Sequence, residues 1–174
     1  MKIDKKSIAI LVISCDNYED LWFPFFEFFS KSWKDCPYKV FLQTNLKDFK
    51  TQHKVNIIKV GEDKSWSDNV IKAIEHLNDF DYLILFLEDM MIDEKVNNKR
   101  IEEILSDFFN SDGNFLSLLN EPKPTKNFNK NFGIIEKGAL YRSTATATIW
   151  KKSVLKELLV SGESAWSFEK NGSK

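Results

Sequence analysis

The sequence predicts an α/β fold, a three-layer sandwich in which helices cover both faces of a central mixed, mostly parallel sheet. Three observations lead to this prediction. Strand and helix patterns alternate through the first half of the chain, the order becomes irregular in the second half, and Tyr82–Leu87 is an unbroken apolar run. Such a run is typical of a strand that is buried on both faces, as in a parallel sheet covered by helices.

The composition is that of one ordinary domain. The chain has 174 residues, 43% of them hydrophobic, so residues 1–174 are expected to form a single core. A formal net charge of −1 provides no field that would gather nucleic acid, and we expect no nucleic-acid partner. Cys15 and Cys36 show neither metal-ligand spacing nor a disulfide framework, which fits a reducing compartment. The apolar segment after Lys6 is too short for a transmembrane span or a signal-peptide core, so we predict a cytoplasmic protein.

The first half contains the clearest elements. Apolar and β-branched runs predict strands at residues 7–14, 38–44, 55–60 and 82–87. A helix over 19–33 is so rich in aromatic residues that it is expected to be buried on most of its surface. A second helix opens at Ser65, because Ser65 and Asp68 have the spacing of a capping box.

The second half is less regular. Helical periodicity predicts a helix over 100–110, followed by a strand over 115–119. Residues 121–138, with two prolines and four lysines, indicate a long mobile loop. Residues 141–150 are strand-like, and Ser153 is expected to cap a helix that Gly162 closes. A turn and a short helix then end the chain.

Two adjacent carboxylates, Glu88 and Asp89, directly follow the apolar run. Ligands of open α/β sheets collect outside the carboxyl ends of the strands, so these acids lie where such proteins perform their chemistry. Because adjacent acids repel each other, both are expected to face water, a basic partner or a divalent cation. The alternative is a solvated strand end without function. The chain has no glycine-rich phosphate loop, no paired metal-binding histidines and no Gly-x-Ser-x-Gly motif.

Several short motifs, taken in order, resemble the nucleotide-sugar glycosyltransferases of the GT-A fold. They are Ser14-Cys15-Asp16, Trp66-Ser67-Asp68, Leu87-Glu88-Asp89, Tyr141-Arg142-Ser143, Ile149-Trp150-Lys151 and the segment from Glu163 to Glu169. The last three are similar to a branch that builds bacterial surface polysaccharides. The resemblance extends over almost the whole chain and implies one GT-A-like domain over residues 1–174.

The resemblance also implies a divalent cation, Mn²⁺ or Mg²⁺, on the diphosphate of the sugar nucleotide. Asp89 would be a direct metal ligand, and Glu88 either a second ligand or a contact to the ribose or to a metal-bound water. Asp93 is expected to be a helix cap or a surface acid. The sequence Glu-Asp-Met departs from the Asp-x-Asp pattern of the family, which puts the metal dependence in question.

Other residues receive roles from the same resemblance. Asp16 would hold the nucleotide base or ribose, with an Asx-turn as the alternative. Asp68 would contact the nucleotide, although a helix cap explains it equally well. Arg142 would neutralise the diphosphate, together with loop lysines that otherwise serve solubility, namely Lys123, Lys126 and Lys130.

At the end of the chain, Glu169 would be the general base. It would take the proton of an acceptor hydroxyl while the sugar is attacked on the face opposite the nucleotide, giving inversion. Trp166 would stack on a sugar ring, whereas the alternative is that Trp166 and Phe168 anchor the C-terminus in the core.

The sequence therefore predicts transfer of a sugar from a nucleotide-sugar donor to a saccharide acceptor in cell-surface polysaccharide assembly. Peripheral association of the protein with a membrane is compatible with this prediction. The chain stops five residues after Glu169, where enzymes of this family usually continue, which indicates either truncation at the C-terminus or a relative that has lost catalysis. Two alternatives stay open. One is a catalytically inactive relative that binds nucleotide or sugar, and the other is a metal-dependent phosphoesterase that uses Glu88, Asp89 and Asp93.

Overall fold

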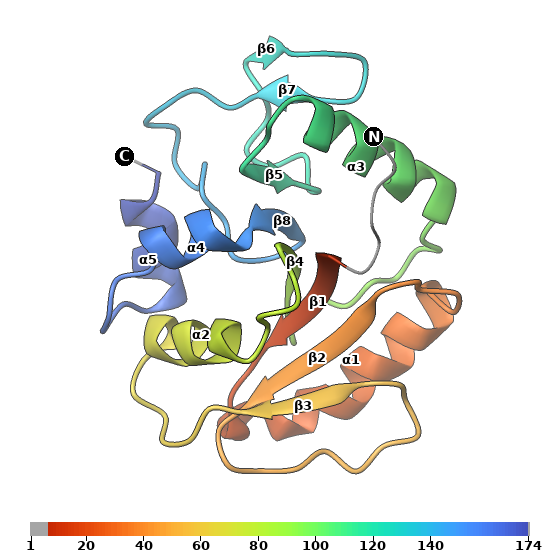
Figure 1. The fold of residues 1–174 in the computed structure, drawn as a ribbon, viewed down its shortest axis with the longest axis vertical. Helices are drawn as coiled ribbons and strands as arrows, with labels where there is room; N and C mark the ends of the chain where they lie inside the picture. Colours follow the sequence, from red (N-terminus) through yellow and green to blue (C-terminus); the bar gives the residue numbers. More distant parts are fainter. Residues whose placement is uncertain (1–6, 174) are drawn as a thin grey trace.

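The structure, a computed structural model, describes residues 7–173 and is built around a six-stranded sheet (Figure 1). The strand order is β3-β2-β1-β4-β8-β5. Strands β1 to β4 are parallel to one another, and β8 is antiparallel to both of its neighbours. The predicted mixed, mostly parallel sheet is thereby confirmed. The strands are β1 (Ile8–Ile13), β2 (Lys39–Thr44), β3 (Asn56–Lys59), β4 (Tyr82–Leu87), β5 (Phe115–Ser117) and β8 (Thr148–Lys151).

Helices cover both faces of this sheet, as the fold class requires. On one face lie α1 (Glu19–Ser32), which a single 3-10 turn (Asp16–Tyr18) precedes, and α3 (Asn98–Asn110). On the other face lie α2 (Trp66–Glu75), α4 (Lys152–Leu158) and α5 (Ala165–Asn171). Alternate residues of β1 enter the two layers: Ile8, Ile10 and Val12 pack in the first, and the residues between them pack in the second.

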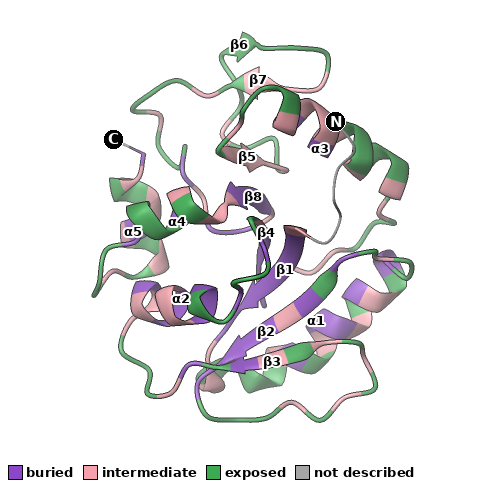
Figure 2. Ribbon diagram, viewed as in Figure 1, coloured by how far each residue is buried: buried purple, intermediate pink, exposed green. Residues whose placement is uncertain are grey.

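The central strands β1 and β4 end at the same edge of the sheet. Every residue of β1 is at most 1% exposed, and Figure 2 shows the buried colour running along β1 and β4. Their parallel register runs from Ile8 opposite Tyr82 to Ile13 opposite Leu87, so the two strands end side by side. From β1 the chain builds β2 and β3 on one side and then crosses to β4 on the other. The switch point of the topology therefore lies between the carboxyl ends of β1 and β4.

The aromatic helix α1 is less buried than its composition suggests. Trp22, Phe25, Phe26 and Phe29 pack on the sheet, but Phe23 and Phe28 are exposed by 59% and 43%. The prediction that most of the helix surface is buried was wrong, because only one face of α1 contacts the sheet.

The second half contains the other differences from the sequence predictions. The expected loop at 121–138 includes a small hairpin of β6 (Lys126–Asn127) and β7 (Gly133–Ile134). Residues 141–147 form turns rather than a strand, and the backbone of Ala147 adopts a φ of +48° just before β8. Helix α4 begins at Lys152 and ends at Leu158, so Ser153 is not its cap and Gly162 lies in the turn before α5. No helix within residues 7–173 is long and apolar enough to cross a membrane.

Candidate functional site

A cavity of about 500 Å³ lies at the switch point of the sheet. Ile13, Ser14 and Cys15 contribute the end of β1 and its loop, while Leu87, Glu88 and Asp89 contribute the end of β4. The cavity forms here because neighbouring parallel strands end together and their loops diverge to opposite sides. Its size is within the range of small-molecule sites.

The acid pair at the end of β4 divides between two environments. Strand β4 ends at Leu87, whose carbonyl accepts the Met90 N–H in a tight turn, and both acids lie in that turn. Asp89 is exposed, as expected. Glu88 is only 7% exposed, so of the three environments predicted for the pair, open water does not apply to Glu88, and a divalent cation stays a prediction. Both carboxylates nevertheless line the cavity.

Burial changes the proton affinity of Glu88. Loss of hydration raises the pKa of its carboxyl to about 7, and the negative charge of Asp89 acts in the same direction. No ion pair involves Glu88 within residues 7–173. Near neutral pH this carboxyl is therefore poised between its protonated and ionised forms.

Asp63 is a third acid in the wall, and the sequence patterns did not single it out. It lies in the turn after β3, where its carboxylate accepts a hydrogen bond of 2.6 Å from the Asn69 amide. A signal for it was available: β3 belongs to the same parallel set as β1, so its following turn reaches the same edge of the sheet. The wall contains Asp63, Glu88 and Asp89 but no lysine or arginine among the described residues.

This donor set fits a divalent cation that is shared with a ligand. Carboxylate oxygens are the ligands that Mg²⁺ prefers, and Mg²⁺ is usually held by one or two of them together with phosphate oxygens. Within residues 7–173, no three His, Cys, Asp or Glu side chains are grouped closely enough to hold an ion by themselves. Asp89 and Glu88 are the residues that would hold the cation, and this assignment stays a prediction.

Aromatic side chains of α2 and α5 complete the wall. Trp66 lies at the start of α2, and its ring centroid is 5.2 Å from that of Phe168 in α5. Trp166, which precedes Phe168 in the same helix, is 74% exposed and also lines the cavity. An exposed indole at the rim offers a flat apolar face to a ligand, and Phe168 rather than Trp166 anchors the helix in the core.

Asp16 does not line the cavity, although the family resemblance implied that it holds the nucleotide base or ribose. Its carboxylate accepts hydrogen bonds from the backbone N–H groups of Asn45, Leu46 and Lys47, at 2.8, 2.9 and 3.1 Å. The Asn45 side chain in turn accepts the Asp16 N–H at 3.0 Å. Asp16 thus joins the loop after β1 to the loop after β2.

The hydrogen-bonding groups of Asp68 are likewise paired within the protein. The Ser65 hydroxyl accepts the Asp68 N–H at 3.1 Å, which confirms the cap at the start of α2. The Asp68 carboxylate accepts hydrogen bonds from the hydroxyls of Ser161 and Ser65 and from the Gly162 N–H. These bonds, with that from Ser161 foremost, lower the pKa of Asp68. Asp68 therefore ties α2 to the turn before α5 and is not part of the cavity wall.

Glu169 also lies outside the cavity wall. Its carboxylate accepts hydrogen bonds of 2.9 Å from both the Thr144 hydroxyl and the Ala145 N–H. These bonds hold α5 to the turn segment before β8. The role of general base stays a prediction, and it requires the carboxylate to exchange these partners for an acceptor hydroxyl.

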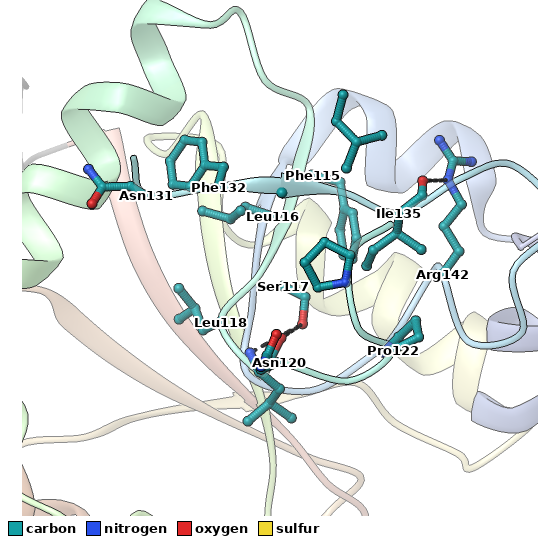
Figure 3. Close-up of a pocket in the computed structure, with 14 residues that line it drawn as sticks. Phe115, Leu116, Ser117, Leu118, Asn120, Pro122, Asn131, Phe132, Ile135 and Arg142 are labelled. Carbon is teal, nitrogen blue, oxygen red and sulfur yellow. Dashed lines mark hydrogen bonds between the residues drawn. The ribbon is translucent and has the colours of Figure 1, made fainter. Parts of the chain in front are cut away.

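Arg142 belongs to a different cavity, next to β5 (Figure 3). Its Nε donates a hydrogen bond of 3.2 Å to the Ile135 carbonyl. Of the predicted site residues, the structure thus brings together Glu88, Asp89 and Trp166 and places the other four elsewhere.

The fold is an α/β fold with a central mixed sheet of six strands. It matches the crystal structure of 2-C-methyl-D-erythritol 4-phosphate cytidylyltransferase from Thermus thermophilus with a TM-score of 0.53. The match covers 87% of this chain and 74% of the other, at 10% sequence identity. The sequence matches no family model and no curated protein. At this identity the likeness concerns the fold.

Proposed function

We propose that this protein is a glycosyltransferase that binds a nucleotide sugar in the cavity between the ends of β1 and β4. The observation that carries the proposal is the presence of Glu88, Asp89 and Trp166 in one cavity at the switch point of the sheet. The fold is shared with an enzyme that is named for cytidylyl transfer, and this supports a nucleotide as the ligand.

Charge supports a cation as part of the complex. A diphosphate alone would be repelled by a wall that holds Asp63, Glu88 and Asp89 and no basic residue among those described. A bound Mn²⁺ or Mg²⁺ would reverse this repulsion and stabilise the negative charge of the leaving diphosphate. Asp89, being exposed in the cavity, is the better placed of the two adjacent carboxylates for direct ligation.

The proposed reaction is a substitution at the anomeric carbon of the donor sugar. The acceptor oxygen forms a bond to the anomeric carbon, the bond from that carbon to the diphosphate breaks, and the nucleoside diphosphate leaves with the electron pair. The acceptor hydroxyl gives its proton to a carboxylate, for which we keep Glu169 as the proposed base. Trp166 would position a sugar ring by stacking on it.

Isothermal titration of UDP, GDP and CDP, each with and without Mn²⁺, tests the proposal. We expect binding of at least one nucleotide to depend on Mn²⁺ and to weaken tenfold or more in Asp89→Asn. Asp93→Asn is the matched control, because Asp93 is an exposed acid of the same loop that does not line the cavity. The absence of nucleotide binding in the folded wild type would refute the proposal.

A turnover assay distinguishes the proposed enzyme from the alternative of a catalytically inactive nucleotide-binding protein. Incubation of the protein with nucleotide sugars should release nucleoside diphosphate, and release should rise when saccharide acceptors are added. Nucleotide binding without any release would identify the binding-only alternative instead.

A further inference from the structure

The second cavity, of about 480 Å³, lies at the far edge of the sheet (Figure 3). One wall is β5 with the residues that follow it as far as Asn120. The other wall comes from the segment 122–135, which includes β7. The cavity is therefore a slot between the last strand of the main sheet and the small hairpin.

The backbone of β5 has an open edge, and this edge belongs to the slot. β5 pairs only with β8, and in this antiparallel pair the Leu118 N–H bonds to the Ala147 carbonyl and the Asn114 carbonyl accepts the Lys151 N–H. Hydrogen-bonded positions alternate along an antiparallel pair, so the backbone N–H and C=O groups of Leu116 also point toward β8. The N–H and C=O groups of Phe115 and Ser117 therefore point away from β8. Neither residue's backbone has a hydrogen bond to a loop or side chain within residues 7–173.

The side chains around this edge are suited to an extended chain. Apolar residues from both walls, Leu116, Leu118, Phe132 and Ile135, line the slot. Gly133 is in a non-bonded pair with Asn127, so its backbone polar groups point away from β6. An extended peptide offers backbone donors and acceptors at its edges and side chains on alternate faces, which matches open strand edges with apolar surroundings.

The charge of the slot indicates one further property of its ligand. Arg142 is its only charged lining residue among those described, and within residues 7–173 its guanidinium has no ion pair. The single Nε bond to Ile135 leaves the other guanidinium N–H groups available. The segment 121–142 carries five basic and two acidic residues in a chain whose net charge is −1. An anionic group is therefore complementary to this end of the slot.

We propose that the slot binds an extended peptide that adds as a strand to the outer edge of β5 and places a carboxylate on Arg142. This site is separate from the proposed sugar-transfer cavity and does not depend on that function. It would let the protein bind an acidic segment or a free carboxyl terminus of a partner protein.

The test is selection of a displayed library of random peptides, about eight residues long with free carboxyl termini, on the intact protein. The key variants are Ser117→Pro and Ser117→Ala. Both lose the hydroxyl that bonds to Leu119, but only proline removes the outward backbone N–H, and proline is tolerated on an open strand edge. We expect selected peptides to bind Ser117→Ala like the wild type and Ser117→Pro at least tenfold more weakly.

Two further arms examine the ligand itself. Arg142→Gln should weaken binding of the selected peptides by tenfold or more, and N-methylation of alternate peptide bonds should abolish it. Circular dichroism and the midpoint of thermal unfolding verify that each variant is folded. If Ser117→Pro fails to fold, the N-methylated peptides supply the same comparison on the wild type.

Three outcomes would overturn the inference. They are no enrichment of peptides on the folded wild type, equal binding of N-methylated peptides, and binding that is insensitive to Arg142→Gln. Sedimentation with phosphatidylglycerol vesicles runs in parallel. Binding to these vesicles without peptide enrichment would mean that the basic segment meets a membrane surface instead.

Discussion

Glu88 is a carboxylic acid that the fold keeps 7% exposed at the end of a central strand. Burial raises its pKa from 4.5 to about 7, so between these values the folded protein binds a proton that the unfolded chain releases. Stability should therefore fall as the pH rises from 4.5 to 7, by at most roughly 3.5 kcal/mol at about 1.4 kcal/mol per pKa unit. Urea unfolding in EDTA, carried out below and above this interval, measures the loss.

Glu88→Gln is the comparison for this pH dependence. The amide cannot ionise, so the variant should lose less stability than the wild type over the same pH interval. Equal losses in both proteins would show that Glu88 is hydrated in the folded state.

Asp16 differs from Glu88, because its carboxylate is satisfied by the backbone. Asp16→Ala would leave the N–H groups of Asn45, Leu46 and Lys47 without their acceptor and should destabilise the protein by roughly 1–3 kcal/mol. Nucleotide affinity, measured well below the unfolding temperature, should change less than in Asp89→Asn. A stable Asp16→Ala variant with a tenfold loss of nucleotide binding would instead support the nucleotide contact that the sequence suggested.

Residue patterns predicted the position of some site residues but not the hydrogen-bond partners of others. Glu88 and Asp89 follow an unbroken apolar run, so their place at the sheet edge could be predicted. The partners of Asp16 are up to 31 positions away along the chain, and the Ser161 and Gly162 partners of Asp68 are 93 and 94 away. Such partners depend on which loops the completed fold brings together, and a single sequence does not contain that information.

At the scale of the element, α5 carries two aromatic residues with opposite environments. Phe168 is 1% exposed and lies against Trp66 and Trp150, whereas Trp166 is 74% exposed. Phe168→Ala should cost roughly 3–5 kcal/mol in the free energy of urea unfolding. Trp166→Ala should change it by less than about 0.5 kcal/mol but weaken donor-sugar binding. A comparable loss of stability in both variants would contradict this orientation of the helix.

Element prediction succeeded where one physical signal dominated. β1 and β4 are continuous apolar runs, and their predicted limits differ from the observed ones by at most one residue at each end. The strand predicted from residue 141 was wrong as far as residue 147, because the small and β-branched residues there form turns. The reason lies in backbone conformation, since Tyr141 and Ala147 adopt φ values of +58° and +48°, which strands do not contain.

At the scale of the whole molecule, the sheet joins two apolar layers that share no helix. The alternation of buried side chains along β1 and β4 could be anticipated from unbroken apolar runs, and it requires helices on both faces. The antiparallel insertion of β8 between β4 and β5 could not be anticipated, because strand order depends on long-range pairing rather than on any local pattern.

Adjacent residues of β4 test whether these layers fold as one unit. Leu83 is fully buried in the layer of α2, α4 and α5, and Ile84 is 1% exposed in the layer of α1 and α3. Leu83→Ala and Ile84→Ala should each lower the free energy of unfolding by roughly 2–5 kcal/mol. Because both layers rest on the same strands, circular dichroism and tryptophan fluorescence should report one coincident transition in each variant. Separate transitions in either variant would mean that one layer unfolds while the sheet still carries the other, and the domain would not be a single cooperative unit.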